Sequence, residues 1–273
     1  MAPARPDITD ELAFLETLAD AARPLALRHF RTGIICESKT EGRDAEYDPV
    51  TAADREVEAR LRALIAQHRP GDGVLGEEQA AAPSSTGRTF IIDPIDGTRA
   101  FIAGLPTWCV LIALSGPDGP MASVIDQPFT GERFLGVTGE AAWLDRGQGR
   151  QPIRTRGHTV NRLEDAIIST TDPGLFNSPE AAAFSSLAAR ARVRRYGLDA
   201  YAYAALALGG IDLVVESGLK AWDAAALIPV VTGAGGVMTN WRGGPCHEGG
   251  QVVAAANAEL HELALEQLSP AAA

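Results

Sequence analysis

Two carboxylates stand at the end of an apolar run in residues 90–98 (FIIDPIDGT). The run predicts a buried strand, and Pro94 and Gly97 predict a turn where it ends. Asp93 and Asp96 lie in that turn, beside backbone amides that a glycine leaves accessible. Such a pairing suits metal ions and a phosphate group. A turn in which both aspartates cap backbone amides is the alternative for this segment taken alone.

Three further acidic segments could supply ligands to the same place. Thr51 and Asp54 open a helical pattern with the spacing of a capping box, and the positive helix end would also hold Asp54 ionised as a base or ligand. Glu77 and Glu78 follow a glycine-rich loop, where paired glutamates are usually solvated unless another segment converges on them. Asp223 begins a helix, where it could simply be a partner of the helix dipole.

Several other chemistries lack support in the sequence. Residues 71–76 (GDGVLG) match G-x-G-x-x-G, but they follow a helix instead of a strand, and acidic residues stand where phosphate-binding amides should begin. The chain contains no P-loop, no G-x-S-x-G elbow and no H-E-x-x-H motif. Its three cysteines are widely spaced, and no two of its five histidines have metal-ligand spacing. Nucleotide-binding, serine-hydrolase and zinc-site functions are therefore disfavoured.

The composition limits the class of protein further. The 273 residues are 46% hydrophobic and 22% charged, which is enough for one large domain or two packed halves with a substantial core. The absence of an eighteen-residue apolar run and of a signal-type N-terminus predicts a cytoplasmic protein. A net charge of −11 argues against nucleic acid or an anionic membrane as partner. It also suits a phosphate-ester enzyme only if cations are recruited to the site.

The pattern of elements predicts an α/β protein. In the first half, helices are expected at 9–31 (kinked or interrupted at Pro24), 51–68 and 98–103, with strands at 89–93, 108–114, 121–126, 133–138 and 140–144. In the second half, strands at 166–170, 193–196, 211–216, 237–241 and 252–256 are interleaved with helices at 180–191, 199–208, 222–233 and 257–268. We therefore expect an α+β half (1–145) and an α/β half (146–273), joined near 145–160.

Taken together, the acidic segments resemble the inositol monophosphatase family. The matching motifs are DPVTAAD ending at Asp54, GEE ending at Glu78, DPIDGT ending at Thr98, and WD ending at Asp223 with a downstream GAGG. Their order and spacing match, and the resemblance covers roughly residues 10–260. It implies a layered αβαβα sandwich of the inositol monophosphatase and fructose-1,6-bisphosphatase type. It also implies a homodimer that hydrolyses small phosphate monoesters with magnesium.

The resemblance also implies a role for each motif residue. Glu77, Asp93 and the Ile95 carbonyl would bind a first Mg²⁺, and Asp93, Asp96 and Asp223 a second. Asp54 would bind a third, weaker ion and, with Thr98, orient the attacking water, so that Asp54, Thr98 and Glu77 are the expected catalytic residues. The backbone amides of Gly97 and Thr98 would hold phosphate oxygens. Five carboxylates with two or three Mg²⁺ ions explain how so acidic a protein could take an anionic substrate.

A narrower resemblance concerns the substrate. Residues 98–106 (TRAFIAGLP), 197–203 (GLDAYAY) and 211–220 (IDLVVESGLK) look like the histidinol-phosphatase branch of the family. Histidinol phosphate carries an ammonium group and a titratable imidazole, with which Asp199 and Glu216 could pair. Arg99 is the third expected substrate contact. A capping role for Asp199 at the predicted helix 199–208 is the alternative.

Two departures from the family pattern bear on specificity. The lysine expected upstream of Asp54 is either Lys39 or missing, because residues 41–47 lengthen that loop. Ala221 and Trp222 stand where several histidinol phosphatases have Pro-Tyr. The hypothesis is a Mg²⁺-dependent histidinol-phosphate phosphatase of histidine biosynthesis. The alternatives are an inositol-1-phosphate or broad sugar-phosphate phosphatase and, more remotely, a non-catalytic regulator, which the intact ligand set disfavours.

Overall fold

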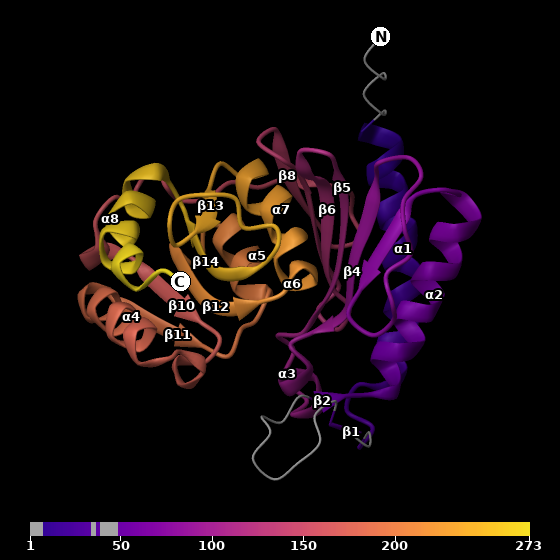
Figure 1. Ribbon diagram of the computed structural model, residues 1–273, viewed down its shortest axis with the longest axis horizontal. Helices are drawn as coiled ribbons and strands as arrows, with labels where there is room; N and C mark the ends of the chain where they lie inside the picture. The colour runs from indigo at the N-terminus through magenta and orange to yellow at the C-terminus, as the bar shows by residue number, and fades with distance from the viewer. Residues whose placement is uncertain (1–7, 34–36, 39–48) are drawn as a thin grey trace.

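The computed structural model describes residues 8–33, 37–38 and 49–273 (Figure 1). Lys39 and the loop 41–47, which bear on the expected specificity, lie outside these residues. Two mixed sheets and their helices make up the described part of the chain. None of its helices has the length and apolar character of a membrane span.

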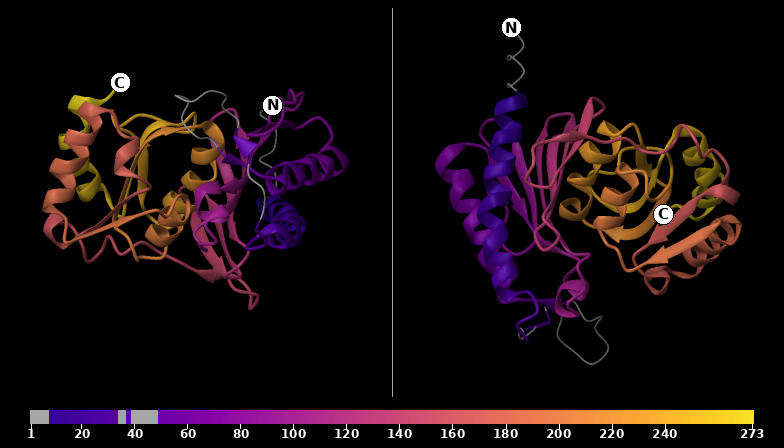
Figure 2. Two further views of the ribbon diagram at one scale, coloured as in Figure 1. Left: turned by 90° about the horizontal axis from the view of Figure 1, so that it is seen from below. Right: turned by 180° about the vertical axis from the view of Figure 1, so that it is seen from behind.

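The first half of the chain builds a seven-stranded sheet whose strand order follows the chain. Its strands are β3 (Gly73–Gly76), β4 (Thr89–Asp96), β5 (Cys109–Gly116), β6 (Gly119–Gln127), β7 (Glu132–Val137), β8 (Ala141–Asp145) and β9 (Gln151–Pro152). Neighbouring strands are antiparallel except β3 and β4, which are parallel. Helices α1 (Ile8–His29) and α2 (Ala52–His68) cover one face, and the short strands β1 (Glu37–Ser38) and β2 (Pro49–Val50) pair beside them (Figures 1 and 2).

The second half builds a five-stranded sheet of order β11-β10-β12-β14-β13. Its strands are β10 (Ile167–Thr170), β11 (Val193–Tyr196), β12 (Leu213–Leu219), β13 (Val237–Asn240) and β14 (Gly250–Ala255). Helices α4 (Ser178–Arg190) and α8 (Ala258–Leu268) cover its outer face. Helices α5 (Tyr201–Ala207), α6 (Ala221–Ala225) and α7 (Leu227–Gly233) lie between the two sheets (Figure 1).

The layers follow from how the strands alternate. On β4, Phe90 and Ile92 pack against α1 and α2, whereas Ile91 packs toward the central helices. Because helices cover both faces, the strand is apolar at nearly every position instead of at every second one. The result is the five-layer αβαβα sandwich that the sequence predicted.

Four predicted elements differ in detail. Helix α1 continues through Pro24, since Ala22 and Ala26 on either side are fully buried in its packed face. Strand β4 extends to Asp96 instead of ending at Asp93. The predicted helix 222–233 is two helices, α6 and α7, that meet at Ala226. The predicted helix 199–208 begins later, as α5 at Tyr201.

Candidate metal and phosphate site

The acidic segment is a bulge at the end of β4 instead of a free turn. Asp93 pairs with Leu111 and Asp96 with Cys109, so three residues of β4 advance against two of β5. Asp93 accepts a hydrogen bond from the Ile95 N–H at 3.0 Å. Asp96 accepts one from the N–H of Ala200, a residue 104 positions later, at 2.7 Å. Each aspartate thus binds one amide, as the alternative interpretation expected, and Asp96 does so across the fold.

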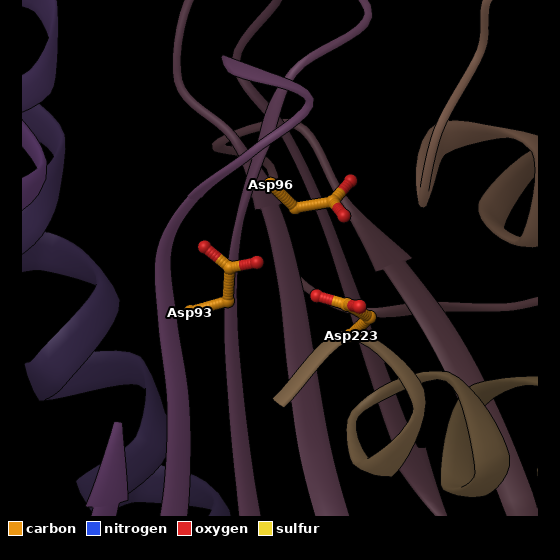
Figure 3. Close-up of side chains that lie close together, drawn as sticks. All are labelled: Asp93, Asp96 and Asp223. Atoms are coloured by element: carbon orange, nitrogen blue, oxygen red, sulfur yellow. The ribbon is translucent and has the colours of Figure 1, made fainter. Parts of the chain in front are cut away.

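The third carboxylate comes from the first turn of α6. One carboxylate oxygen each from Asp93, Asp96 and Asp223 lie within 4.8 Å of one another. Figure 3 shows the three side chains gathered at this point. Asp223 is held in place by the Lys220 N–H, which donates to it at 2.7 Å. Residues of two different layers therefore meet in one cluster.

The electrostatics of this cluster fit a divalent cation. Burial, together with the neighbouring carboxylates, raises the pKa of Asp93 and of Asp96 well above the usual range. Burial, to which the charge of Glu77 adds, raises the pKa of Asp223 to about 7. Negative charge is costly here unless a cation neutralises it, and all three groups offer carboxylate oxygens of the kind that Mg²⁺ prefers.

Glu77 and Asp54 reach the same region from β3 and α2. Gly76 pairs with Ile92 in the parallel β3–β4 ladder, so Glu77 follows beside Asp93. The predicted capping box is present, since the N–H and hydroxyl of Thr51 donate to Asp54 Oδ2 at 2.8 and 2.5 Å. Asp54 Oδ1 is buried without a hydrogen-bond partner among the described residues. Burial, supported by the charge of Glu77, raises the pKa of Asp54. One oxygen of Asp54 is thus fixed while the other is available to a ligand.

A pocket of about 210 Å³ opens over the cluster. Its wall includes Glu77, Asp93, Asp96 and Asp223, together with residues of α5, of β12 and of the segment that follows β10. Ile95, Gly97 and Thr98 of the acidic segment line it as well, and the Thr98 hydroxyl donates to the Ile95 carbonyl at 3.1 Å. Asp54 stands beside Glu77 without lining the pocket itself.

Asp199 is a pocket residue and not a helix cap. Its φ of +48° is left-handed, the residue at the cap position of α5 is Ala200, and that helix begins only at Tyr201. A side chain on Gly97 would come within 3.1 Å of the Asp199 carboxylate, so the two predicted segments touch. Burial raises the pKa of Asp199 to about 6, and the positive charge of Arg99 opposes this rise. Asp199 and Arg99 are therefore neighbours, with Arg99 at the exposed rim.

Glu216 is 5% exposed on β12 and lines the same pocket. It accepts hydrogen bonds from the N–H and hydroxyl of Thr171, at 2.7 and 3.0 Å, and from the hydroxyl of Thr170 at 3.2 Å. Burial nevertheless raises its pKa to about 8. Glu216 would hold a proton at neutral pH until a cationic group arrives to replace it.

Two polar residues among those of the pocket wall that were not predicted are Thr171 and Tyr203. Thr171 orients Glu216 from the end of β10. Tyr203 on α5 is 1% exposed, and its hydroxyl has no hydrogen-bond partner in the described part of the chain. The resemblance of residues 197–203 to the histidinol-phosphatase branch is the one signal for Tyr203 in the sequence. Without it, a tyrosine in an alanine-rich helix would be interpreted as a packing residue.

Comparisons with known proteins agree with this geometry. The model of the inositol monophosphatase family matches residues 7–272. The bifunctional phosphatase IMPL2 of Arabidopsis thaliana is 37% identical over 262 residues, which cover 92% of this chain and 72% of the relative. A histidinol-phosphatase of Mycobacterium tuberculosis is 36% identical over 268 residues, covering 95% of this chain and 98% of the relative. A solved structure of an inositol monophosphatase from Zymomonas mobilis matches with a TM-score of 0.82 at 37% identity, covering 97% of this chain and all of that one.

The chain belongs to the inositol monophosphatase family. Within that family it is a phosphatase of phosphate monoesters, with an acidic cluster suited to metal ions.

Proposed function

We propose that the protein is a Mg²⁺-dependent histidinol-phosphate phosphatase. The observation that carries the proposal is the meeting of two kinds of carboxylate in one pocket. Asp93, Asp96 and Asp223 form the acidic cluster, and Asp199 and Glu216 line the same pocket. The similarity to the histidinol-phosphatase of Mycobacterium tuberculosis along nearly the whole chain supports the same assignment.

The chain's own residues would hold two or three Mg²⁺ ions. Glu77, Asp93 and the Ile95 carbonyl form the first ligand set, Asp93, Asp96 and Asp223 the second, and Asp54 the third. Bound magnesium supplies charge neutralisation, acidifies the attacking water and stabilises the leaving oxygen.

Asp54 and Thr98 would orient the water. Asp54 Oδ2 is held by Thr51, so Oδ1 can accept a proton from that water without the side chain turning. The Thr98 hydroxyl donates its proton to the Ile95 carbonyl, so its oxygen can accept a hydrogen bond from the same water. The amides of Gly97 and Thr98 would bind the phosphate oxygens.

The reaction is a direct displacement at phosphorus. The water oxygen forms a bond to phosphorus, and the bond between phosphorus and the ester oxygen breaks. The departing oxygen takes a proton to give histidinol, and inorganic phosphate remains. No covalent bond to the protein forms.

Recognition of the organic part would use the part of the pocket wall formed by Asp199 and Glu216. Histidinol phosphate carries an ammonium group and an imidazole, which are partners for the Asp199 and Glu216 carboxylates, and Arg99 lies at the rim beside Asp199. The buried Tyr203 hydroxyl is a further hydrogen-bonding group on this side. Inositol phosphate offers only hydroxyl groups to the same wall, so buried carboxylates would gain less from it. A place in histidine biosynthesis follows from this substrate.

The second candidate is an inositol-1-phosphate or broad sugar-phosphate phosphatase. Similarity to the inositol monophosphatase of Zymomonas mobilis favours it, as does Trp222 before Asp223. A non-catalytic regulator is a weaker candidate because each ligand position carries a carboxylate. The homodimer and the cytoplasmic location remain proposals from the sequence.

Phosphate release from three esters tests the assignment. Histidinol phosphate, inositol-1-phosphate and fructose-1,6-bisphosphate are each compared at equal concentration, with Mg²⁺ and with a chelator. We expect histidinol phosphate to give the highest kcat/KM, and only with Mg²⁺. A preference for inositol phosphate would favour the second candidate, and no turnover of any ester would favour the regulator.

An Asp96→Asn protein completes this experiment. The substitution keeps the shape of the side chain and removes one charge from the cluster, so turnover should fall by about a hundredfold or more. A variant that retained full rate would refute the metal assignment. Because its folding can be checked by circular dichroism, loss of activity is separable from loss of structure.

A further inference from the structure

Helix α2 carries a second buried carboxylate one turn after Asp54. Glu58 is fully buried, with 0% exposure, although it is charged and lies on a surface helix. Positions 54 and 58 are four residues apart, so both side chains point from the same face of the helix. This face contacts the loop that follows β3. The Glu58 side chain therefore links α2, which also carries Asp54, to the loop that carries Glu77.

The contacts of Glu58 surround Glu77 on both sides. Its Oε2 accepts the Glu78 N–H at 2.7 Å, and its Oε1 accepts the Gln79 N–H at 3.0 Å. On the other side of Glu77, a side chain on Gly76 would come within 2.5 Å of Glu58 Oε1, so the carboxylate lies directly against the backbone there. The buried Glu58 side chain thus attaches the loop at Glu77 to α2.

Arg62 completes this arrangement. Its Nε donates to Glu58 Oε1 at 2.7 Å, and its Nη2 donates to the carbonyl of Gln79 at 3.0 Å. A helix-surface ion pair alone would not require a fully buried carboxylate, since such pairs usually remain in water. An apolar side chain would fill the space with a smaller desolvation cost, but it could not accept the two loop N–H groups.

We infer that Glu58 is a positioning residue for the metal site, which holds Glu77 in register with Asp54 and Asp93 and thereby sets the affinity for Mg²⁺. The inference rests on the metal-dependent function proposed above and does not depend on which ester is the substrate. Glu58 itself touches neither substrate nor ion. Its contribution is to hold Glu77 still before an ion arrives, so that binding does not have to order the loop.

The test is Mg²⁺ binding to the metal-free full-length protein, measured by calorimetry with Mg²⁺ alone, in wild type and in Glu58→Gln. Glutamine has nearly the same shape but only one acceptor oxygen. The N–H groups of Glu78 and Gln79, which bind different oxygens of Glu58, would have to share it. We expect the Kd for Mg²⁺ to rise about tenfold or more, and the Mg²⁺ concentration for half-maximal activity to rise in parallel. At saturating Mg²⁺, kcat should return to within about threefold of wild type, because the ligands themselves are intact.

Glu11→Gln is the matched control. Glu11 is also a buried carboxylate, 5% exposed, and it pairs with Arg88 and Arg69 at the opposite end of β4 from the cluster. We expect this variant to lose thermal stability while its Kd for Mg²⁺ stays at the wild-type value. If Glu58→Gln also lost only stability and kept the wild-type Kd, or if Glu11→Gln weakened Mg²⁺ equally, the positioning role would be refuted.

A second variant covers a failure of Glu58→Gln to fold. Gly76→Ala keeps Glu58 but places a methyl group where its carboxylate now lies, so the Kd for Mg²⁺ should rise in the same way. Wild-type affinity in Gly76→Ala would overturn the inference. Absence of Mg²⁺ binding by the wild-type protein would instead overturn the proposed metal-dependent function, and a different preferred ester would leave the role of Glu58 untouched.

Discussion

At the scale of single residues, the backbone holds each of the three aspartates of the acidic cluster through one amide. The Ile95 amide holds Asp93, the Ala200 amide holds Asp96, and the Lys220 amide holds Asp223. Such bonds orient a carboxylate without neutralising it. Burial therefore still raises the pKa values of these carboxylates, and a bound cation would offset the cost of their negative charge.

Asp199 is the residue on which substrate preference is best tested. Asp199→Ala removes a buried carboxylate from the pocket wall, so the KM for histidinol phosphate should rise about tenfold while kcat changes little. The KM for inositol-1-phosphate should change much less, because a neutral polyol has no cation to lose. Steady-state kinetics on both esters measure the difference.

Asp199→Asn separates charge from backbone strain. Asparagine tolerates the left-handed φ of +48° as aspartate does, whereas alanine does so less readily. Both variants should raise the KM for histidinol phosphate if charge is the cause. An unchanged ratio between the two esters in both variants would argue that Asp199 serves the fold alone.

At the scale of elements, the central helices carry Asp223 to the first sheet. Ser123 on β6 donates to the carbonyl of Ala226, at the junction of α6 and α7, at 2.6 Å. Helix α7 then lies so close to β7 that a side chain on Gly136 would come within 2.4 Å of the Pro229 carbonyl carbon. The close contact between α7 and β7 fixes the distance of the adjoining helix α6 from the sheet, and with it the position of Asp223.

Gly136→Ala should therefore be costly. The added methyl group meets backbone atoms that cannot rotate away, so the free energy of unfolding should fall by about 3 kcal/mol. Gly131→Ala is the comparison: its φ of +76° is strained for alanine, but no atom lies within 4 Å, and a loss of about 1–2 kcal/mol is expected. Urea unfolding measures both. Equal losses would mean that α7 can move away from β7 without penalty.

At the scale of the whole molecule, the site belongs to neither sheet alone. The first sheet and its helices supply Asp54, Glu77, Asp93 and Asp96, the central layer supplies Asp199 and Asp223, and the second sheet supplies Glu216. The net charge of −11 is thus partly concentrated in one pocket between layers. Folding without cations has to bury these carboxylates together, which makes stability depend on pH.

Glu216 lets this dependence be measured. Its pKa is raised by burial from an ordinary value near 4.5 to about 8, so the folded metal-free protein binds a proton between these values that the unfolded chain does not. The contribution of Glu216 to stability therefore falls as pH rises from about 5 to about 8, by about 1.4 kcal/mol per pH unit for this one proton.

Glu216→Gln should flatten that slope. Thermal unfolding of the metal-free protein across this pH range, in wild type and variant, gives the comparison. Glutamine removes the titrating group and keeps the hydrogen-bonding shape, so the two stability curves should diverge toward high pH, with the variant the more stable. Parallel curves would show that Glu216 keeps an ordinary pKa.

The sequence by itself predicted the candidate ligand set and the α/β class of the fold. Asp54, Glu77, Asp93, Asp96 and Asp223 are recognisable because each sits in a short motif that resembles one of the family. The apolar periodicity predicts the helices and strands and hence an α/β protein, and the resemblance implies their layering as a sandwich.

Only the tertiary structure decided what surrounds those ligands. In the structure, Asp199 is not the cap of α5, and the buried Glu216 accepts hydrogen bonds from two threonines. Tyr203 lines the pocket, and Glu58 binds the loop that carries Glu77. None of these features has a local pattern, since each depends on contacts between segments 20 or more residues apart. Local spacing encodes which groups can bind an ion. Burial and charge at a given site arise only when distant segments pack together.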